Sequence, residues 1–117
     1  MTSLIDSVSV RIEVDDIDAA LPTYQALAGT DRIGRYEFPE FTLAVVGLFM
    51  LLHGEREVLE RFRRAATLHV PDLDAAVDAF TGHGGAVIDG PVAAAGGART
   101  IVRDRDGNVF ECFAHPA

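Results

Sequence analysis

Lysine and tryptophan are both absent from this chain of 117 residues, and cysteine occurs once. All ten basic residues are therefore arginines, and 18 acidic residues outnumber them, which gives a formal net charge of −8. An acidic chain without a basic stripe predicts no binding to nucleic acid or to an anionic membrane. Because the single Cys112 has no internal disulfide partner, a reducing, cytoplasmic location is favoured.

Long hydrophobic runs are absent as well. No apolar stretch approaches the length needed to cross a bilayer, and the best candidate, residues 41–52, is predicted to form two paired strands. The first residues, MTSLIDSVSV, have neither the basic start nor the apolar core of an export signal. The chain is long enough to bury a sizeable core, so we expect a single domain over residues 1–117.

The chain does contain an internal repeat. Residues 14–24, VDDIDAALPTY, align without a gap with residues 70–80, VPDLDAAVDAF, and five of the eleven positions are identical. An alternating segment precedes each copy, SVSVRIEV and ATLHV, and such alternation is typical of a half-buried strand. Asp16 and Asp72 are suitable N-caps for the helix that each copy predicts. The repeat therefore predicts two copies of one strand–helix unit.

Further strands follow each predicted helix. We expect them near residues 32–37, 41–46 and 48–53 in the first copy, and near residues 86–88, 99–103 and 109–114 in the second. DRDGN joins the last two strands and is a tight-turn sequence. EREVLERFRRA, between the copies, contains no turn residue and predicts a connecting helix. The order is therefore βαβββ, linker, βαβββ, with module 1 at about 7–53, the linker helix at about 55–64 and module 2 at about 65–114.

This pattern resembles the vicinal oxygen chelate superfamily, which includes glyoxalase I, extradiol dioxygenases and bleomycin-binding proteins. The resemblance is carried by the two V-x-D-[IL]-D-A-A junctions and by DRDGNVFE, which is similar to the family's D-P-D-G-N-x-x-E with Arg105 in place of proline. It implies an α+β fold in which two βαβββ modules form a curved-sheet cleft. It also implies a homodimer as the usual assembly.

The resemblance implies four metal-ligand positions as well, on the first and last strand of each module. The family's spacing, with Gly47 aligned to Gly107, places them at Ser9, Leu51, Ala65 and Glu111. Of these, Glu111 alone is a usual ligand of a divalent ion, and one carboxylate does not hold such an ion against water. We therefore expect no bound metal and no other cofactor.

Alternation along the strands predicts which side chains face the cleft and bind a ligand. They are Arg11, Glu13, Phe49, Leu51, His53, Thr67, His69, Glu111 and Phe113. Cys112 alternates to the opposite face, toward the helices. A displaced metal site remains an alternative, because Glu13, His53, His69 and Glu111 offer two nitrogen and two oxygen ligands. Their spacing differs from the family's, since both histidines lie near strand ends.

We expect this cleft to bind a small molecule, because an apolar floor with a few polar groups is typical of ligand pockets. The expected function is metal-free binding of an antibiotic-like or other cationic or aromatic ligand, since acidic protein attracts cations. The alternative is a lyase, isomerase or dioxygenase-type enzyme that uses Glu111 with Arg11 or His69, or a displaced metal. A third possibility is a structural or regulatory dimer without a ligand.

Overall fold

The computed structural model describes residues 1–94 and 96–116, and in these ranges the chain forms eight strands and three helices. In chain order they are β1 (Ser7–Glu13), α1 (Ile17–Ala28), β2 (Gly34–Glu37), β3 (Phe41–Val46), β4 (Phe49–Gly54), α2 (Arg56–Arg61), β5 (Ala66–His69), α3 (Leu73–Thr81), β6 (Ala86–Ala94), β7 (Gly97–Arg103) and β8 (Val109–Ala114). The order βαβββ occurs twice with α2 between the copies, which confirms the predicted α+β fold class.

The chain divides into two compact units. The N-terminal unit is Val10–Arg63, and the C-terminal unit is Met1–Ser9 together with the chain from Arg64 onward. The unit boundary therefore falls inside β1, whereas the sequence placed the whole strand in module 1. Backbone pairing explains this division, because the first three residues of β1 are aligned with β5 (Ser7 with His69, for example).

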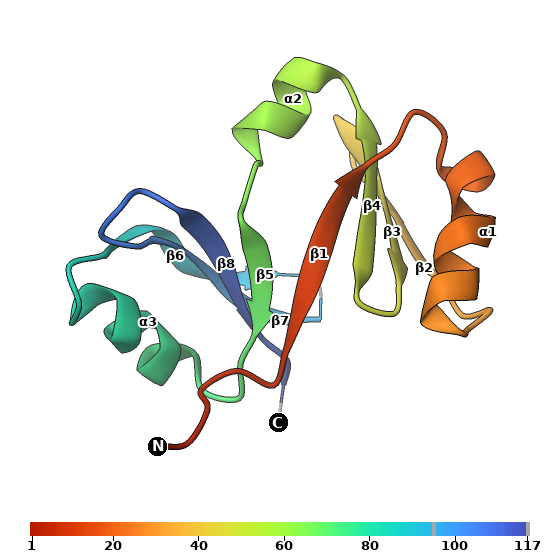
Figure 1. Cartoon of the computed structure of the whole chain (residues 1–117). Coiled ribbons are helices and arrows are strands. Elements are labelled where there is room, and N and C mark those ends of the chain that lie inside the picture. Colours follow the sequence, from red (N-terminus) through yellow and green to blue (C-terminus); the bar gives the residue numbers. More distant parts are fainter. Residues whose placement is uncertain (95, 117) are drawn as a thin grey trace. The chain divides into compact units, whose positions relative to one another are not determined.

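The N-terminal unit contains a sheet in the order β2–β3–β4–β1, in which β4 and the second half of β1 are parallel. Helix α1 lies against one face of this sheet (Figure 1). Ile17 and Leu21 from the buried stripe of the helix pack with Leu51 of β4. Apolar side chains from both layers thus form the core of this unit.

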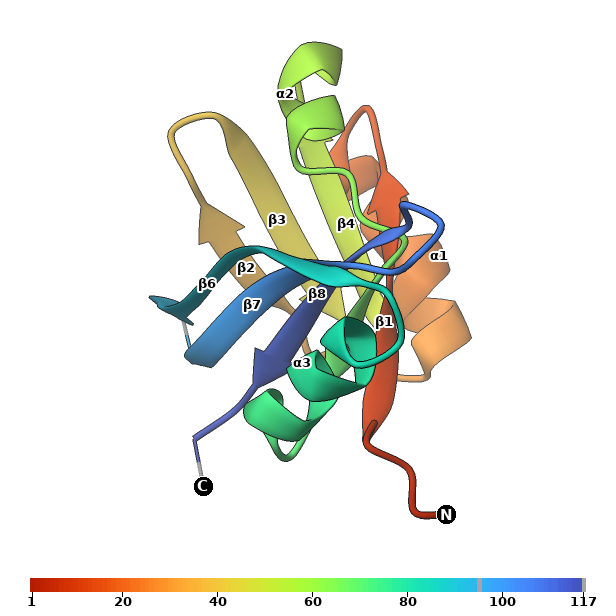
Figure 2. The same cartoon turned by 90° about the vertical axis from the view of Figure 1, so that its left-hand side faces the viewer.

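The C-terminal unit contains a sheet in the order β1–β5–β8–β7–β6, in which the first half of β1 takes part (Figure 2). Its core lies between the sheet and α3. Leu68 of β5, Cys112 of β8 and Ala76 of α3 are buried together there. The prediction that Cys112 points toward the helices is therefore confirmed.

Both repeat helices begin with the same cap. A carboxylate oxygen of Asp16 accepts a hydrogen bond from the amide of Ala19 at 3.1 Å, and Asp72 accepts one from Ala75 at 3.1 Å. These contacts satisfy amides that have no partner within the helix, and they confirm both N-cap predictions. Gly29 ends α1 with a φ of 69°, a left-handed conformation that favours glycine.

Several element boundaries differ from the sequence-based prediction. Strand β6 runs over Ala86–Ala94 rather than 86–88, and its pairing with β7 shifts register on both sides of Asp89. These irregularities break the alternation that identifies a strand in a sequence. Helix α2 is shorter than predicted, and β2 begins two residues later. No helix in the described ranges is long and apolar enough to span a membrane.

Candidate functional site

A cluster of polar side chains lies on one face of the C-terminal sheet. Helix α3 packs on the opposite face, where Leu68 and Cys112 are neighbours in the register. Since successive side chains alternate between the two faces, the adjacent pair Thr67 and Glu111 points away from α3. We call this surface the polar face, and it consists of Ser9, Thr67, His69, Arg99, Glu111 and Phe113.

Glu111 is held on the polar face by two neighbours. The hydroxyl of Thr67 donates a hydrogen bond to Oε1 of Glu111 at 3.2 Å, and Nη1 of Arg99 lies 3.8 Å from Oε2. The exposed fraction is 19% for the Glu111 side chain and 35% for that of Arg99. Both carboxylate oxygens therefore face a group of this chain, and the guanidinium offsets the negative charge.

His69 connects the buried part of the polar face to its rim. Its Nε2 lies 2.7 Å from the hydroxyl of Ser9, and its Nδ1 lies 3.3 Å from Nε2 of His115. Burial, followed by the nearby His115, lowers the pKa of His69. The imidazole is therefore neutral at pH 7. It can accept the Ser9 proton at Nε2, or donate its own proton there, depending on the tautomer.

Aromatic rings border the polar face beside His69. The rings of His69 and His115 are stacked at a centroid distance of 5.4 Å, and the ring of Phe113 meets His115 edge-on at 4.8 Å. Burial lowers the pKa of Arg64, which follows α2, and the charge of Glu111 offsets part of this effect. Polar, charged and aromatic groups thus occur together on one sheet face, as in many small-molecule sites.

Of the nine residues predicted to bind a ligand, the polar face brings four together, namely Thr67, His69, Glu111 and Phe113. Arg11 and Glu13 lie on the side of the N-terminal sheet away from α1, because the intervening Ile12 packs into the core. Glu13 also lies 3.7 Å from Arg63. His53 is exposed, and its Nδ1 lies 3.1 Å from the carbonyl oxygen of Val14.

The prediction that Phe49 and Leu51 face the same side as Arg11 is wrong. Leu51 has no exposed surface and packs in the core with α1, and the ring of Phe49 lies 5.0 Å from that of Tyr24 on the same helix. Both side chains belong to the interior of the N-terminal unit. Neither is available on the face that carries Arg11.

The error comes from aligning Gly47 with Gly107. Arg11 pairs with Met50, and its repeat counterpart Thr67 pairs with Glu111, so Met50 is the counterpart of Glu111. Two residues separate the paired ends of β3 and β4, whereas five separate those of β7 and β8. Glycine therefore occupies different positions in the two hairpins. A slip of one residue moves every side chain to the other face.

Sequence reasoning also missed Arg99 and His115. Arg99 pairs with Phe113 across the β7–β8 hairpin, so counting outward from DRDGN would have placed it on the polar face. His115 follows β8, and no pattern in the sequence marks it as a neighbour of His69. The predicted pairing of Arg11 with Glu111 stays a prediction, while Arg99 is an arginine that the C-terminal unit places beside Glu111.

The residues at the implied metal-ligand positions do not fit a divalent ion. With the register corrected, these positions are Ser9, Met50, Ala65 and Glu111. Alanine has no donor atom, a thioether is a soft ligand, and the Ser9 hydroxyl is engaged with His69. Within the described part of each unit, no three His, Cys, Asp or Glu side chains group closely enough to hold a metal.

Two βαβββ units built from one repeat, each with a helix on one face of its sheet, define a paired-module α+β protein. A sequence model of the Glyoxalase/Bleomycin resistance protein/Dioxygenase superfamily matches residues 5–112. The chain belongs to this superfamily, which confirms the resemblance seen in its motifs. A search of curated proteins found no match.

Solved structures share the fold. An uncharacterized, hypothetical protein from Methanosarcina mazei is 32% identical with a TM-score of 0.84, and the match covers 96% of this chain and 94% of that one. Methylmalonyl-CoA epimerase from Mycobacterium tuberculosis is 19% identical with a TM-score of 0.75, over 100% of this chain and 93% of that one. At that level of identity the likeness to the epimerase shows the fold alone.

Proposed function

We propose that this chain is a small-molecule-binding member of its superfamily that works without a metal and uses the polar face as its binding surface. The observation that carries the proposal is the state of Glu111. Its carboxylate is fixed by Thr67 and balanced by Arg99, so it is oriented without a cation. A fixed carboxylate beside a guanidinium offers both an acceptor and a donor to a ligand.

The aromatic border of the polar face supports an organic ligand that carries a flat or apolar group. The edges and faces of Phe113 and His115 provide contact area, while the oxygens of Glu111 can accept hydrogen bonds from a donor group such as an amine. This combination agrees with the cationic or aromatic ligand expected from the acidic composition. Antibiotic-like compounds are one class with these properties.

Metal content provides the first test. Protein purified without a chelator should contain far less than one equivalent of zinc, nickel, manganese or iron by elemental analysis. EDTA should leave its melting temperature unchanged. One equivalent of a transition metal that is lost in Glu111→Gln would contradict the proposal.

Ligand binding is tested by native mass spectrometry and a thermal-shift screen of aromatic amines and their anionic analogues. Compounds that stabilise the protein should lose their effect in Glu111→Gln. They should keep it in Glu57→Gln, a matched change of an exposed glutamate on α2. Ligands that stabilise both variants equally would show that the polar face is not their site.

An enzyme using acid–base chemistry is the second candidate, and one observation favours it. The neutral imidazole of His69 lies 2.7 Å from the Ser9 hydroxyl, which is the geometry of a proton-transfer pair. In this case a compound bound by the wild-type protein would change in mass or configuration during incubation. That conversion would stop in His69→Gln while binding remained.

A further inference from the structure

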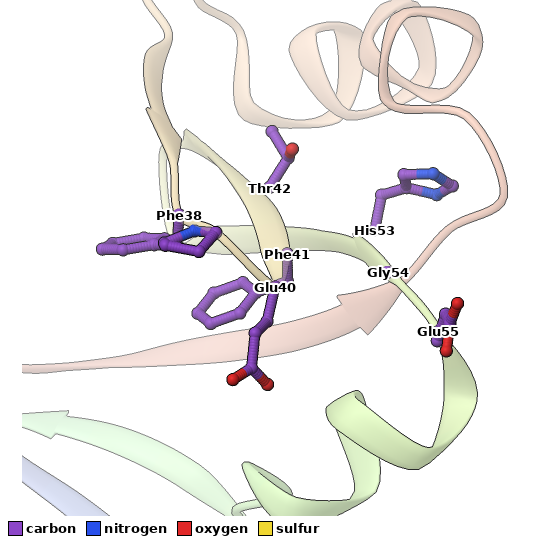
Figure 3. A pocket seen from close by; sticks show the side chains of 8 residues that line it. Phe38, Glu40, Phe41, Thr42, His53, Gly54 and Glu55 are labelled. Carbon is purple, nitrogen blue, oxygen red and sulfur yellow. The ribbon is translucent and has the colours of Figure 1, made fainter.

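We infer a second ligand site in the N-terminal unit, an aromatic and acidic pocket that takes a small organic cation with an apolar body. The pocket has a volume of about 410 Å³ and lies where the turn between β2 and β3 meets the end of β4 (Figure 3). This volume lies within the range of small-molecule sites. The site belongs to a different unit from the polar face and goes beyond the function proposed for that face.

Three aromatic rings form a row, and two of them, Phe38 and Phe41, line this pocket. Phe38 stacks on Phe41 with a centroid distance of 4.8 Å and an interplanar angle of 28°, and Phe41 meets Phe62 at 5.4 Å. The two hydrophobic core clusters of the described residues include none of these three rings. They are three of only seven phenylalanines in the chain, so their grouping outside the core requires an explanation.

Phe38 keeps an open ring surface. It is 43% exposed, and it contacts Phe41 through a single stacked arrangement, while Phe41 lies between two rings and is half-buried. Exposing an aromatic side chain forgoes the free energy that its burial would contribute. A cation placed over the face of an aromatic ring is attracted by the ring's quadrupole. The exposed face of Phe38 can therefore bind a cation.

The polar groups of the pocket act as hydrogen-bond acceptors. Glu40 and Glu55 supply carboxylates, and Arg61 of α2 pairs with Glu40 at 2.8 Å. Glu55 precedes α2, and its side chain makes no capping hydrogen bond there. Two carboxylates and one guanidinium leave the pocket with net negative charge, which favours a cation and disfavours an anion.

His53 also lines the pocket, but its side chain lies on the other face of the sheet from Phe41, because His53 pairs with Thr42 whereas Phe41 pairs with Gly54. Since the carbonyl of Val14 can only accept, Nδ1 of His53 must carry the proton and donate to it at 3.1 Å. Figure 3 shows His53 and Thr42 pointing to one side of β4, and Phe41 and Glu40 pointing to the other. The ammonium group of a ligand is therefore expected near the carboxylates of Glu40 and Glu55, and its aryl group beside Phe38.

The test uses the full chain, labelled with ¹⁵N, and 2-phenylethylammonium as the probe. Amide signals of Phe38, of residues 40–42 and of residues 53–55 should shift and saturate at probe concentrations on the order of millimolar. The anion 3-phenylpropanoate has a similar size and apolar body. It should bind at least about fivefold more weakly, because the sign of its charge is opposite.

Two variants with matched controls test which side chains of the pocket contribute to binding. Phe38→Ala should weaken the affinity for the cation about two- to fivefold. Leu48→Ala, which removes another exposed apolar side chain of the same unit, should not. Glu55→Gln should weaken the affinity for the cation by a similar factor of about two to five. Glu57→Gln on the neighbouring helix should leave this affinity unchanged.

Several outcomes would overturn the inference. They are equal affinity for the anion and the cation, shifts that do not saturate, shifts centred outside the pocket, or a Glu55→Gln variant that binds as the wild type does. Glu111→Gln should leave this binding intact, because Glu111 does not line the pocket. The two proposals can therefore fail independently.

Discussion

The two units share a repeat, but their sheets carry different side chains on the face opposite the helix. At equivalent positions of the register, the C-terminal unit has Thr67 beside Glu111, and the N-terminal unit has Arg11 beside Met50. A carboxylate that accepts a hydrogen bond and faces a guanidinium thus has a thioether as its counterpart. The same backbone plan therefore supports a carboxylate at this position in one unit and a thioether in the other.

The faces that pack against the helices differ much less. Leu51 and Cys112 occupy equivalent positions, and neither has any exposed surface. Burial raises the pKa of the Cys112 thiol to about 11, so this side chain remains an uncharged, apolar part of the core at neutral pH. Packing against a helix restricts these positions in both units, whereas the opposite faces carry different side chains.

The largest expected effect on stability follows from placing a carboxyl group on the sheet face that packs against the helix. Leu51→Glu should destabilise the protein at pH 7 by about 3–5 kcal/mol, because the charge would be buried without a partner. Burial raises the folded-state pKa of such a glutamate above its unfolded value of about 4.3. The loss of stability should therefore grow as pH rises above the unfolded pKa toward the raised folded-state pKa, and it should be smallest in acid.

Urea denaturation at several pH values measures this effect. Leu48→Glu is the matched control, because Leu48 lies in the β3–β4 turn and is 54% exposed. It should change the free energy of unfolding by no more than about 0.5 kcal/mol. If Leu51→Glu changed the free energy of unfolding as little as the control does, Leu51 would face solvent. Its equivalence with the buried Cys112 would then be wrong.

A smaller effect tests what the two units have in common. Asp16→Ala and Asp72→Ala each remove a carboxylate that accepts an amide proton at 3.1 Å, and each should cost about 1 kcal/mol of stability. The double variant should lose about 2 kcal/mol, because separate sites contribute additively. Asp15→Ala, a change of an exposed neighbour that does not cap the helix, should have little effect. Markedly unequal losses would indicate that the caps are not equivalent.

The smallest effect concerns the polar face and depends on pH. The pKa of His69 is lowered in the folded state, by burial first and by His115 second. The neutral form is therefore favoured on folding, and this contribution to stability is present above the unfolded pKa of about 6.5 and is lost as pH falls. His69→Gln should flatten the acid side of the stability curve between about pH 5 and 7.

Chemical denaturation of wild-type protein and two variants across that range measures the effect. His83→Gln is the control, since His83 is an exposed histidine near the end of α3. It should leave the slope of stability against pH unchanged. An equal slope in wild type and His69→Gln would show that the environment of His69 does not disfavour its charged form.

The sequence predicted the elements that local chemistry determines. The repeat at Val14 and Val70, the capping carboxylates and the alternation before each helix led to the correct fold class and family. Motif spacing also identified Glu111 as a carboxylate at an implied ligand position. These features depend on residues close together in the chain, so the order of residues alone reveals them.

Only the tertiary structure decided which side chains meet. The assignment of Leu51 depended on the number of residues in a hairpin turn, and backbone pairing showed that it shares a face with Ile12 in the core rather than with Arg11. The Thr67 partner of Glu111 and the Ser9 partner of His69 come from strands distant in sequence. Phe41 and Phe62, which meet beside the aromatic pocket, are likewise far apart in the chain. Such contacts depend on register and packing between distant segments, and a side-chain period of two makes them sensitive to a shift of a single residue.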